Sequence, residues 1–198
     1  MRYAQSTIPT DYGPVDVIVY REGEEGEEEH LALVRDDAGA PSDEPWLVRV
    51  HSECWTGEVL HSHKCDCRAQ LDSALKMIAA CRHGVVVYLR QEGRGIGLGN
   101  KIRAYALQEE GLDTVEANRA LGFADDARSY DVAVAILRDL GALRVRLLTN
   151  NPDKVRGLER GGIKVVERVP LVVAETAESV EYLDVKAKRL GHAVDRKV

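Results

Sequence analysis

Three cysteines between residues 54 and 67 have the spacing of a metal site. They are Cys54, Cys65 and Cys67, and a polar run over residues 49–53 comes directly before them. Three thiolates can hold a zinc ion tetrahedrally and leave its fourth position free for water. The pKa of such a water falls toward ~7, so that it becomes a hydroxide nucleophile. The spacing therefore indicates a zinc site that can catalyse hydrolysis.

Two other interpretations of these cysteines stay open. His51, His61 or His63 could supply a fourth ligand and close the zinc site, which would make it structural. The thiols could also be buried without any metal. Cys65 and Cys67 are too close in sequence for an ordinary disulfide with each other, and clustered thiols in a reducing compartment favour a metal.

Two segments further along contain residue types that bind phosphate. Residues 90–101 are rich in glycine, follow an expected strand and open an expected helix, where backbone amides can hold phosphate. They fit neither the dinucleotide pattern G-x-G-x-x-G nor the P-loop pattern G-x-x-x-x-G-K-[ST]. Residues 148–154 pass from a strand end into a helix start. By spacing alone, both segments are interpreted as turns.

The elements that must position these residues alternate between strands and helices. Short apolar runs predict strands over residues 15–20, 30–34, 46–50, 85–89, 145–148 and 163–166. Apolar residues at helical spacing predict helices over residues 70–79, 102–110, 132–140, 154–160 and 177–190. We expect one α/β domain over residues 1–198, with a central mixed β-sheet flanked by helices. A mobile acidic turn is expected at about 22–29, and a short polar tail at about 192–198.

Composition excludes several classes of protein. The chain has 198 residues, 44% of them hydrophobic, and a formal net charge of −6. An acidic chain lacks the broad positive field of a general nucleic-acid binder, so no nucleic-acid partner is expected. No apolar run approaches the ~20 residues of a membrane span, and the first residues do not open a signal peptide. We therefore expect no membrane partner and a cytoplasmic location.

Seven sequence blocks, taken in order, resemble the GTP cyclohydrolase II family. They are residues 49–54 (RVHSEC), 65–67 (CDC), 90–94 (RQEGR), 100–105 (NKIRAY), 113–118 (DTVEAN), 121–123 (LGF) and 147–152 (LLTNNP). The resemblance extends from about residue 30 to about residue 192. Any single block is weak, but this many in the same order make the resemblance highly specific.

The resemblance implies a fold, a reaction and a set of cofactors. Cys54, Cys65 and Cys67 would bind one catalytic Zn²⁺ per chain, whose water attacks C8 of the guanine of GTP and releases that carbon as formate. Pyrophosphate would also leave, with Mg²⁺ neutralising the triphosphate. The implied product is 2,5-diamino-6-(5-phosphoribosylamino)pyrimidin-4(3H)-one, in the first step of riboflavin biosynthesis. A homodimer is implied as well.

Three catalytic residues are implied by the same matching. Asp126 would act as general acid or base, Arg128 as a nucleophile that forms a covalent nucleotidyl intermediate, and Tyr105 would lie beside the reacting base. A guanidinium with a pKa above ~12 is a poor nucleophile, so Arg128 as a bidentate phosphate clamp is the alternative. The residues implied to line the GTP site are Arg49, His51, Ser52, Glu53, Gln70, Glu92, Gly93, Arg94, Thr114, Thr149 and Lys154.

The zinc loop departs from the family pattern. The family usually reads R-C-D-C-G, whereas Lys64 precedes and Arg68 follows the two cysteines here, and His61 and His63 are unusual as well. Two further functions therefore stay open. One is a homologue that stops at the formamide intermediate or serves specialised metabolism, and the other is a zinc-stabilised nucleotide-binding protein without turnover.

Overall fold

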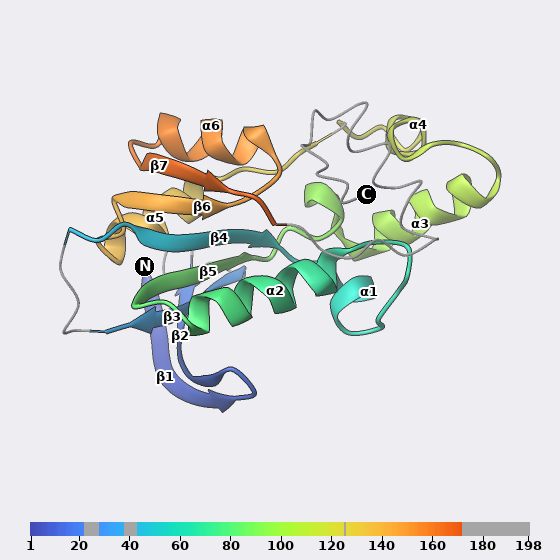
Figure 1. Ribbon diagram of the computed structural model, residues 1–198. Helices are drawn as coiled ribbons and strands as arrows, with labels where there is room; N and C mark the ends of the chain where they lie inside the picture. Colours follow the sequence, from blue (N-terminus) through green and yellow to red (C-terminus); the bar gives the residue numbers. More distant parts are fainter. Residues whose placement is uncertain (22–27, 38–42, 125, 172–198) are drawn as a thin grey trace, which may run out of the picture.

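Seven strands form one mixed sheet in the computed structural model, which describes residues 1–21, 28–37, 43–124 and 126–171. The order across the sheet is β1-β2-β3-β5-β4-β6-β7 (Figure 1). The strands are β1 (Arg2–Thr10), β2 (Gly13–Arg21), β3 (Glu29–Asp36), β4 (Trp46–Ser52), β5 (His83–Leu89), β6 (Arg144–Leu148) and β7 (Lys164–Val169). Neighbours from β1 to β5 are antiparallel, and neighbours from β5 to β7 are parallel. The predicted mixed α/β sheet is confirmed.

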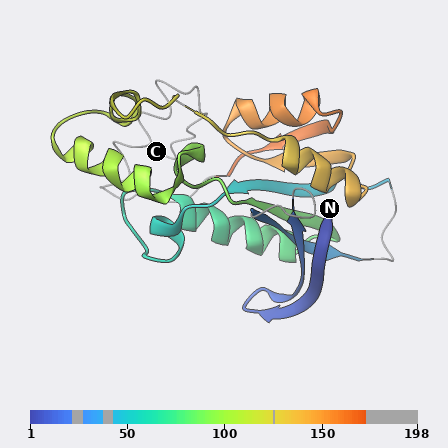
Figure 2. The same cartoon turned by 180° about the vertical axis from the view of Figure 1, so that it is seen from behind.

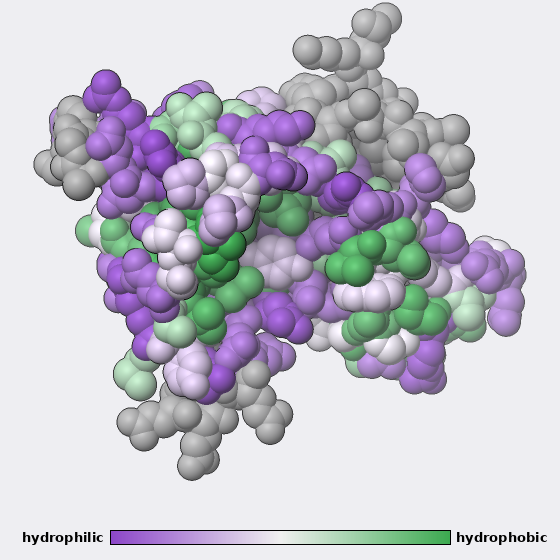
Figure 3. Space-filling view, turned by 90° about the horizontal axis from the view of Figure 1, so that it is seen from below, coloured by the Kyte–Doolittle hydropathy of each residue, from purple (hydrophilic) through white to green (hydrophobic). Residues whose placement is uncertain are grey.

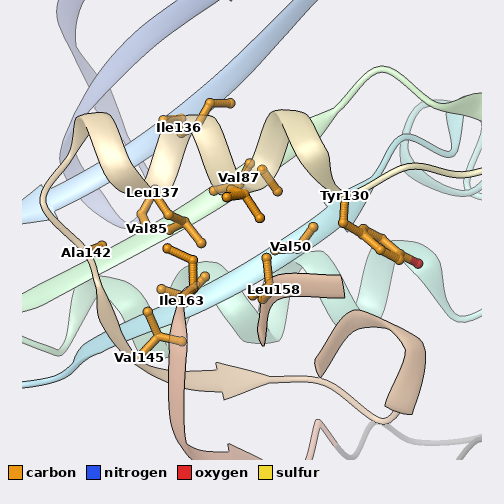
Figure 4. Packing of buried hydrophobic residues seen from close by; sticks show 14 of the residues in the cluster. Val50, Val85, Val87, Tyr130, Ile136, Leu137, Ala142, Val145, Leu158 and Ile163 are labelled. Carbon is orange, nitrogen blue, oxygen red and sulfur yellow. The ribbon is translucent and has the colours of Figure 1, made fainter. Parts of the chain in front are cut away.

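Helices cover both faces of the parallel part of the sheet (Figures 1 and 2). They are α1 (Trp55–Glu58), α2 (Cys67–Ala79), the 3-10 turn η1 (Glu92–Gly95), α3 (Gly97–Glu109), α4 (Thr114–Ala120), α5 (Asp131–Asp139) and α6 (Pro152–Arg160). Helix α2 packs on one face through Ala74 and Ile78, which contact Val86 of β5. Helices α5 and α6 pack on the other face, against Val85 and Val87 (Figure 4).

The middle of strand β5 is a continuous apolar run because both of its faces are buried. Val85, Val86 and Val87 of β5 are all fully buried, although successive side chains point to opposite faces. Burying such side chains contributes about 1.5–3 kcal/mol each. This central core fixes the direction and register of β4 and β5, and therefore the positions of the loops that follow them.

The predicted strands and helices are present wherever the structure describes them, with small shifts at their ends. Helix α3 begins at Gly97, five residues before the predicted start, so the end of the glycine-rich segment belongs to the helix. Three elements were not predicted, namely β1, α1 and α4. Strand β1 has exposed side chains throughout, so it has no alternating pattern to detect. Helix α4 carries a capping box of Asp113 and Glu116, which could have revealed it.

Several predictions fall outside the described residues. These are the helix over 177–190, the polar tail at about 192–198 and most of the acidic turn at 22–29. Of the two described residues of that turn, Glu28 lies outside any strand, whereas Glu29 is the first residue of β3. No helix among the described residues has the length and apolar character needed to cross a membrane.

The loops that carry the candidate site residues follow three of the parallel strands and lie at one edge of the sheet. The chain passes from β4 to its neighbour β5 and then returns to β6 on the other side of β4. This change of direction makes the carboxyl end of β4 a topological switch point, where ligands bind in open α/β sheets. Helices α3 and α4 extend beyond this edge (Figure 1). The surface seen from below is largely hydrophilic, and its hydrophobic side chains gather in two groups, one at the end that carries α1 and one on the half nearer β1 (Figure 3).

Candidate active site

The three cysteine sulfurs converge where β4 meets α1 and α2. Cys54 precedes α1, and Cys67 is the first residue of α2. The Sγ atoms of Cys54, Cys65 and Cys67 all lie within 4.8 Å of one another, and those of Cys54 and Cys65 are 3.6 Å apart. Sulfurs about 2.3 Å from a tetrahedral zinc ion are separated by about 3.8 Å. The donor set and its spacing therefore fit zinc.

Histidines do not complete this group among the residues that the structure describes. The ligand atoms within 4.8 Å of one another come from three cysteines and from no histidine. His51 directs Nε2 to Glu58 Oε1 at 2.8 Å, and His61 and His63 are exposed. Among the described residues, no histidine is therefore placed as a fourth ligand beside the three cysteines.

One cavity at this edge of the sheet collects nearly all of the residues that the sequence singled out. Its volume is about 1040 Å³, counting the opening to solvent. The implied site residues that line it are Arg49, His51, Ser52, Glu53, Cys54, Cys67, Gln70, Glu92, Gly93, Arg94, Tyr105, Thr114, Arg128, Thr149 and Lys154. Cys65 and Asp126 do not line the cavity, but each contacts a residue that does. The parallel strand ends thus bring together segments that are up to 105 residues apart in sequence.

A buried cation lies against the cysteine group. Lys101 of α3 places Nζ 3.1 Å from Cys54 Sγ and 2.8 Å from Glu92 Oε1. Burial lowers the pKa of Lys101, but the hydrogen bond to Glu92 and the charge of Cys54 outweigh it and raise that pKa. Hydrogen bonds from Cys65 and Cys67, and then Lys101, hold the pKa of the Cys54 thiol far below its usual range. The surroundings therefore favour the thiolate form at Cys54, whereas the hydrogen bond with Cys54 raises the pKa of the Cys65 thiol.

Glu58 holds the loop that carries Cys54. Its Oε1 accepts from the Cys54 backbone N–H at 2.9 Å, and its Oε2 accepts from the Tyr88 hydroxyl at 2.6 Å. An ionised carboxylate is an acceptor only, so the His51 contact is an Nε2–H donor bond to Oε1. His51 also stacks on Tyr88, with ring centroids 5.7 Å apart. Sequence reasoning missed Glu58, although it comes four residues after the first cysteine.

Burial of His51 makes the stability of the fold depend on pH. Burial lowers the pKa of His51 to about 4, despite the hydrogen bond to Glu58, so the ring is neutral in the folded chain. The unfolded chain, with a histidine pKa near 6.5, binds this proton more readily as the pH falls below that value. Stability from the neutral ring is therefore fully present above about pH 6.5 and is lost toward pH 4.

We expect wild type to lose about 2 kcal/mol more unfolding free energy than His51→Gln between pH 7.5 and pH 5. The glutamine keeps a donor toward Glu58 but does not titrate. Denaturant unfolding of both chains at each pH measures the difference. Any metal loss at low pH affects both chains, so it cancels in the comparison. Parallel pH curves would show that His51 does not titrate as argued.

A chain of hydrogen bonds anchors the zinc loop to the sheet. Gln70 Nε2 donates to Asp66 Oδ2 at 2.5 Å, and Arg49 Nη2 donates to Gln70 Oε1 at 2.6 Å. Arg49 also donates to the Leu148 carbonyl at 3.0 Å, at the end of β6. Two residues implied to bind substrate thus also position the segment between Cys65 and Cys67.

Asp126 and Arg128 form a tight ion pair beside the cavity. Arg128 Nε lies 2.9 Å from Oδ1 of Asp126, and Nη2 lies 2.5 Å from Oδ2. Burial alone would raise the pKa of Asp126, but the hydrogen bonds and charge of Arg128 hold it below its usual value. A carboxylate of low pKa is a weak base, and pairing stabilises the protonated guanidinium.

Arg94 offers buried donors without partners in the described part of the chain. Its two terminal nitrogens are shielded from solvent and make no hydrogen bond there. Gly93 and Arg94 both have φ of +61°, a conformation that favours glycine and that costs energy at an arginine. Such strain at a cavity wall, beside guanidinium nitrogens that make no hydrogen bond among the described residues, is typical of an anion-binding position.

Lys64 and Arg68, two of the four residues that depart from the family pattern, each pair with a carboxylate. Lys64 Nζ pairs with Glu109 at 3.2 Å and lies 4.9 Å from the centre of the Tyr105 ring. Arg68 Nε lies 3.7 Å from Asp72 Oδ2. Lys64 and Arg68 are both outside the set of residues that line the cavity.

Comparisons with known proteins identify the family of this chain. The model of the family described as GTP cyclohydrolase II matches residues 1–170. The chain belongs to the GTP cyclohydrolase II family.

Individual relatives extend the match over nearly the whole chain. GTP cyclohydrolase-2 of Histophilus somni (strain 2336) is 52% identical over 191 residues, which cover 96% of this chain and 87% of that protein. GTP cyclohydrolase-2 of Haemophilus influenzae (strain PittGG) is also 52% identical, over 96% of this chain and 88% of that protein. Riboflavin biosynthesis protein RibBA of Bacillus subtilis (strain 168) is 53% identical over 96% of this chain, but the match covers 48% of that protein. This chain is therefore an enzyme of the GTP cyclohydrolase II family.

The absence of a side chain at Gly57 leaves room for the three cysteine side chains of this GTP cyclohydrolase II family member. A Cβ at this buried position would lie 2.9 Å from Cys65 Sγ and 3.3 Å from Cys54 Sγ. We expect Gly57→Ala to lower stability by about 1–3 kcal/mol through overpacking, and to weaken zinc binding. Thermal unfolding and a competitive zinc titration measure the two effects.

Gly99→Ala is the matched control, because a Cβ at Gly99 meets no atom within 4 Å. It lies in α3, where alanine in place of glycine stabilises a helix by roughly 0.5–1 kcal/mol. Equal zinc affinity in the two variants would show that Gly57 is not needed for the metal group.

Proposed function

We propose that this chain is a zinc-dependent GTP cyclohydrolase II that opens the guanine ring at C8 and releases formate and pyrophosphate. The product would be 2,5-diamino-6-(5-phosphoribosylamino)pyrimidin-4(3H)-one, in the first step of riboflavin biosynthesis. Mg²⁺ accompanying the triphosphate, homodimerisation and a cytoplasmic location belong to the same proposal and rest on the family resemblance. The observation that supports it is a group of three cysteines, with no histidine among the described ligand atoms, beside a cavity that Cys54 and Cys67 line at the switch point of the sheet.

Cys54, Cys65 and Cys67 are the residues that would hold the zinc ion. When bound, zinc would activate water for attack on a carbon that bears nitrogen. Ring opening and deformylation both add water to such a carbon, so one site can serve both steps if the intermediate stays bound. The chain's own part is to keep the thiolates converged through Glu58, Gly57 and Lys101.

The cavity offers separate groups for the two ends of GTP. Tyr105 lies on α3, one turn after Lys101, and its hydroxyl is suited to hydrogen-bond or relay a proton beside the base. Arg94 and Arg128 supply cations for the triphosphate. We assign Arg128 as a charged clamp, because its pairing with Asp126 stabilises the protonated form.

The reaction is tested by incubating the zinc-loaded chain with GTP and Mg²⁺ and analysing the products by mass and by formate release. The proposal expects formate, pyrophosphate and the deformylated pyrimidine in equal amounts. A product that retains the formyl group, without formate, would assign the chain to the branch that stops at the intermediate. Unchanged GTP would favour the nucleotide-binding protein without turnover.

A further inference from the structure

Lys101 is a buried cation in contact with the cysteine group. It comes from α3, beyond the sheet edge, and is only 9% exposed. Its Nζ lies 3.1 Å from Cys54 Sγ and 2.8 Å from Glu92 Oε1. No position in the zinc or substrate set described above includes Lys101, although it lines the cavity.

The charges around this ammonium require a cation at that point. Three thiolates with one divalent ion carry a net charge of −1, and the Glu92 carboxylate carries another. Glu92 has an 8% exposed side chain, and it is held in place by the N–H groups of Trp55 and Gly93. Without Lys101, two partly dehydrated anionic groups would face each other, which is unfavourable at short range.

We propose that Lys101 is a positioning residue of the metal centre. Its ammonium group donates a hydrogen bond to the Cys54 sulfur, and this bond reduces the electron donation of that sulfur to the bound ion. This inference rests on the zinc site of the proposed function. Thiolates are strong electron donors, and three of them would reduce the ability of the ion to activate water. A hydrogen bond to a sulfur ligand withdraws electron density from it, as outer partners of metal ligands do in other sites.

A purely structural role is the competing explanation. Lys101 could serve only to neutralise Glu92, and its contact with Cys54 would then be incidental. The two roles can be distinguished in a chain that also lacks the Glu92 carboxylate. In Glu92→Gln the buried carboxylate is gone, so a further Lys101→Met change no longer leaves that charge unpaired. Any loss caused by Lys101→Met in that background belongs to the sulfur contact.

The test measures metal binding and the spectrum of the Co²⁺-substituted chain, so it does not depend on turnover. Zinc affinity is obtained by competition with a coloured chelator. The proteins compared are wild type, the single variants Lys101→Met, Lys101→Arg and Glu92→Gln, and the double variant that combines Lys101→Met with Glu92→Gln. We expect Lys101→Met to weaken zinc binding about 10- to 100-fold in either background, because losing the contact that positions the Cys54 sulfur outweighs the stronger donation of the freed thiolate. The sulfur-to-cobalt charge-transfer band should move to longer wavelength, because a thiolate without its hydrogen bond donates more strongly. Lys101→Arg, which keeps a cationic donor, should recover most of both properties.

Each outcome is decisive. Failure of wild type to bind one equivalent of zinc would overturn the proposed zinc site itself. Normal wild-type binding, with affinity and cobalt spectrum unchanged when Lys101→Met is added to Glu92→Gln, would overturn the role of Lys101 alone. If the single Lys101→Met chain does not fold, the comparison between Glu92→Gln and the double variant still decides the question.

Discussion

Replacement of Cys65 by alanine should abolish formate release from GTP. The three sulfurs lie within 4.8 Å of one another, and Cys65 Sγ is 3.6 Å from Cys54 Sγ. Two remaining thiolates cannot hold zinc in the same way. Metal assistance contributes several kcal/mol to a hydrolytic step, which corresponds to a loss of about 10³-fold or more. Formate is measured over time at saturating GTP, and zinc per chain is measured on the same sample.

Cys81→Ala is the control for this change. Cys81 lies outside the group and donates its S–H to the carbonyls of Ile78 and His83, at 3.0 and 3.3 Å. It should keep one zinc per chain and full formate release. Formate production by Cys65→Ala at the rate of Cys81→Ala would show that the cysteine group does not carry the chemistry.

Replacement of Arg128 by methionine should have the next largest effect, on the release of pyrophosphate. The guanidinium is held by Asp126 at the cavity wall, where it can stabilise charge that develops on the triphosphate. Arginines in this role contribute about 10³-fold or more to phosphoryl transfer. Pyrophosphate release in a single turnover measures the loss.

Arg128→Lys separates the two interpretations of this residue. A lysine keeps the charge but loses the paired donors, so a clamp predicts a partial loss of about 10–100-fold relative to wild type. A nucleophilic arginine predicts a nucleotide attached to Arg128 in wild type quenched during turnover. Mass analysis of the quenched wild-type protein checks this point. An adduct at Arg128 would contradict the clamp assignment.

The sequence was sufficient to predict the central sheet and the cysteine group. Strands such as residues 85–89 are continuous apolar runs, and they are buried on both faces as that pattern requires. Cys54, Cys65 and Cys67 are close in sequence, so their convergence needs only one turn and a helix start. Strand β1 could not be predicted in this way, because its exposed side chains have no core to mark them.

The partners of the cysteine group could not be predicted, because they arrive from distant segments. Lys101 reaches Cys54 across 47 residues, and Tyr88 reaches Glu58 across 30. Neither contact follows from a local pattern, because each depends on where the sheet places β5 and α3. For Glu92, the sequence indicated a role in the site but not its partners within the chain. The resemblance implied contact with substrate, while the structure adds bonds from Trp55, Gly93 and Lys101 that no motif encodes.

The most direct measurement is formate release as zinc is returned to the chain after removal of its metal by a chelator. Formate release should be absent at first, should rise in proportion to added zinc and should stop rising at one zinc per chain. Undiminished formate release before any zinc is returned would contradict the account. A rise that continues to two or more zinc ions per chain would contradict it as well.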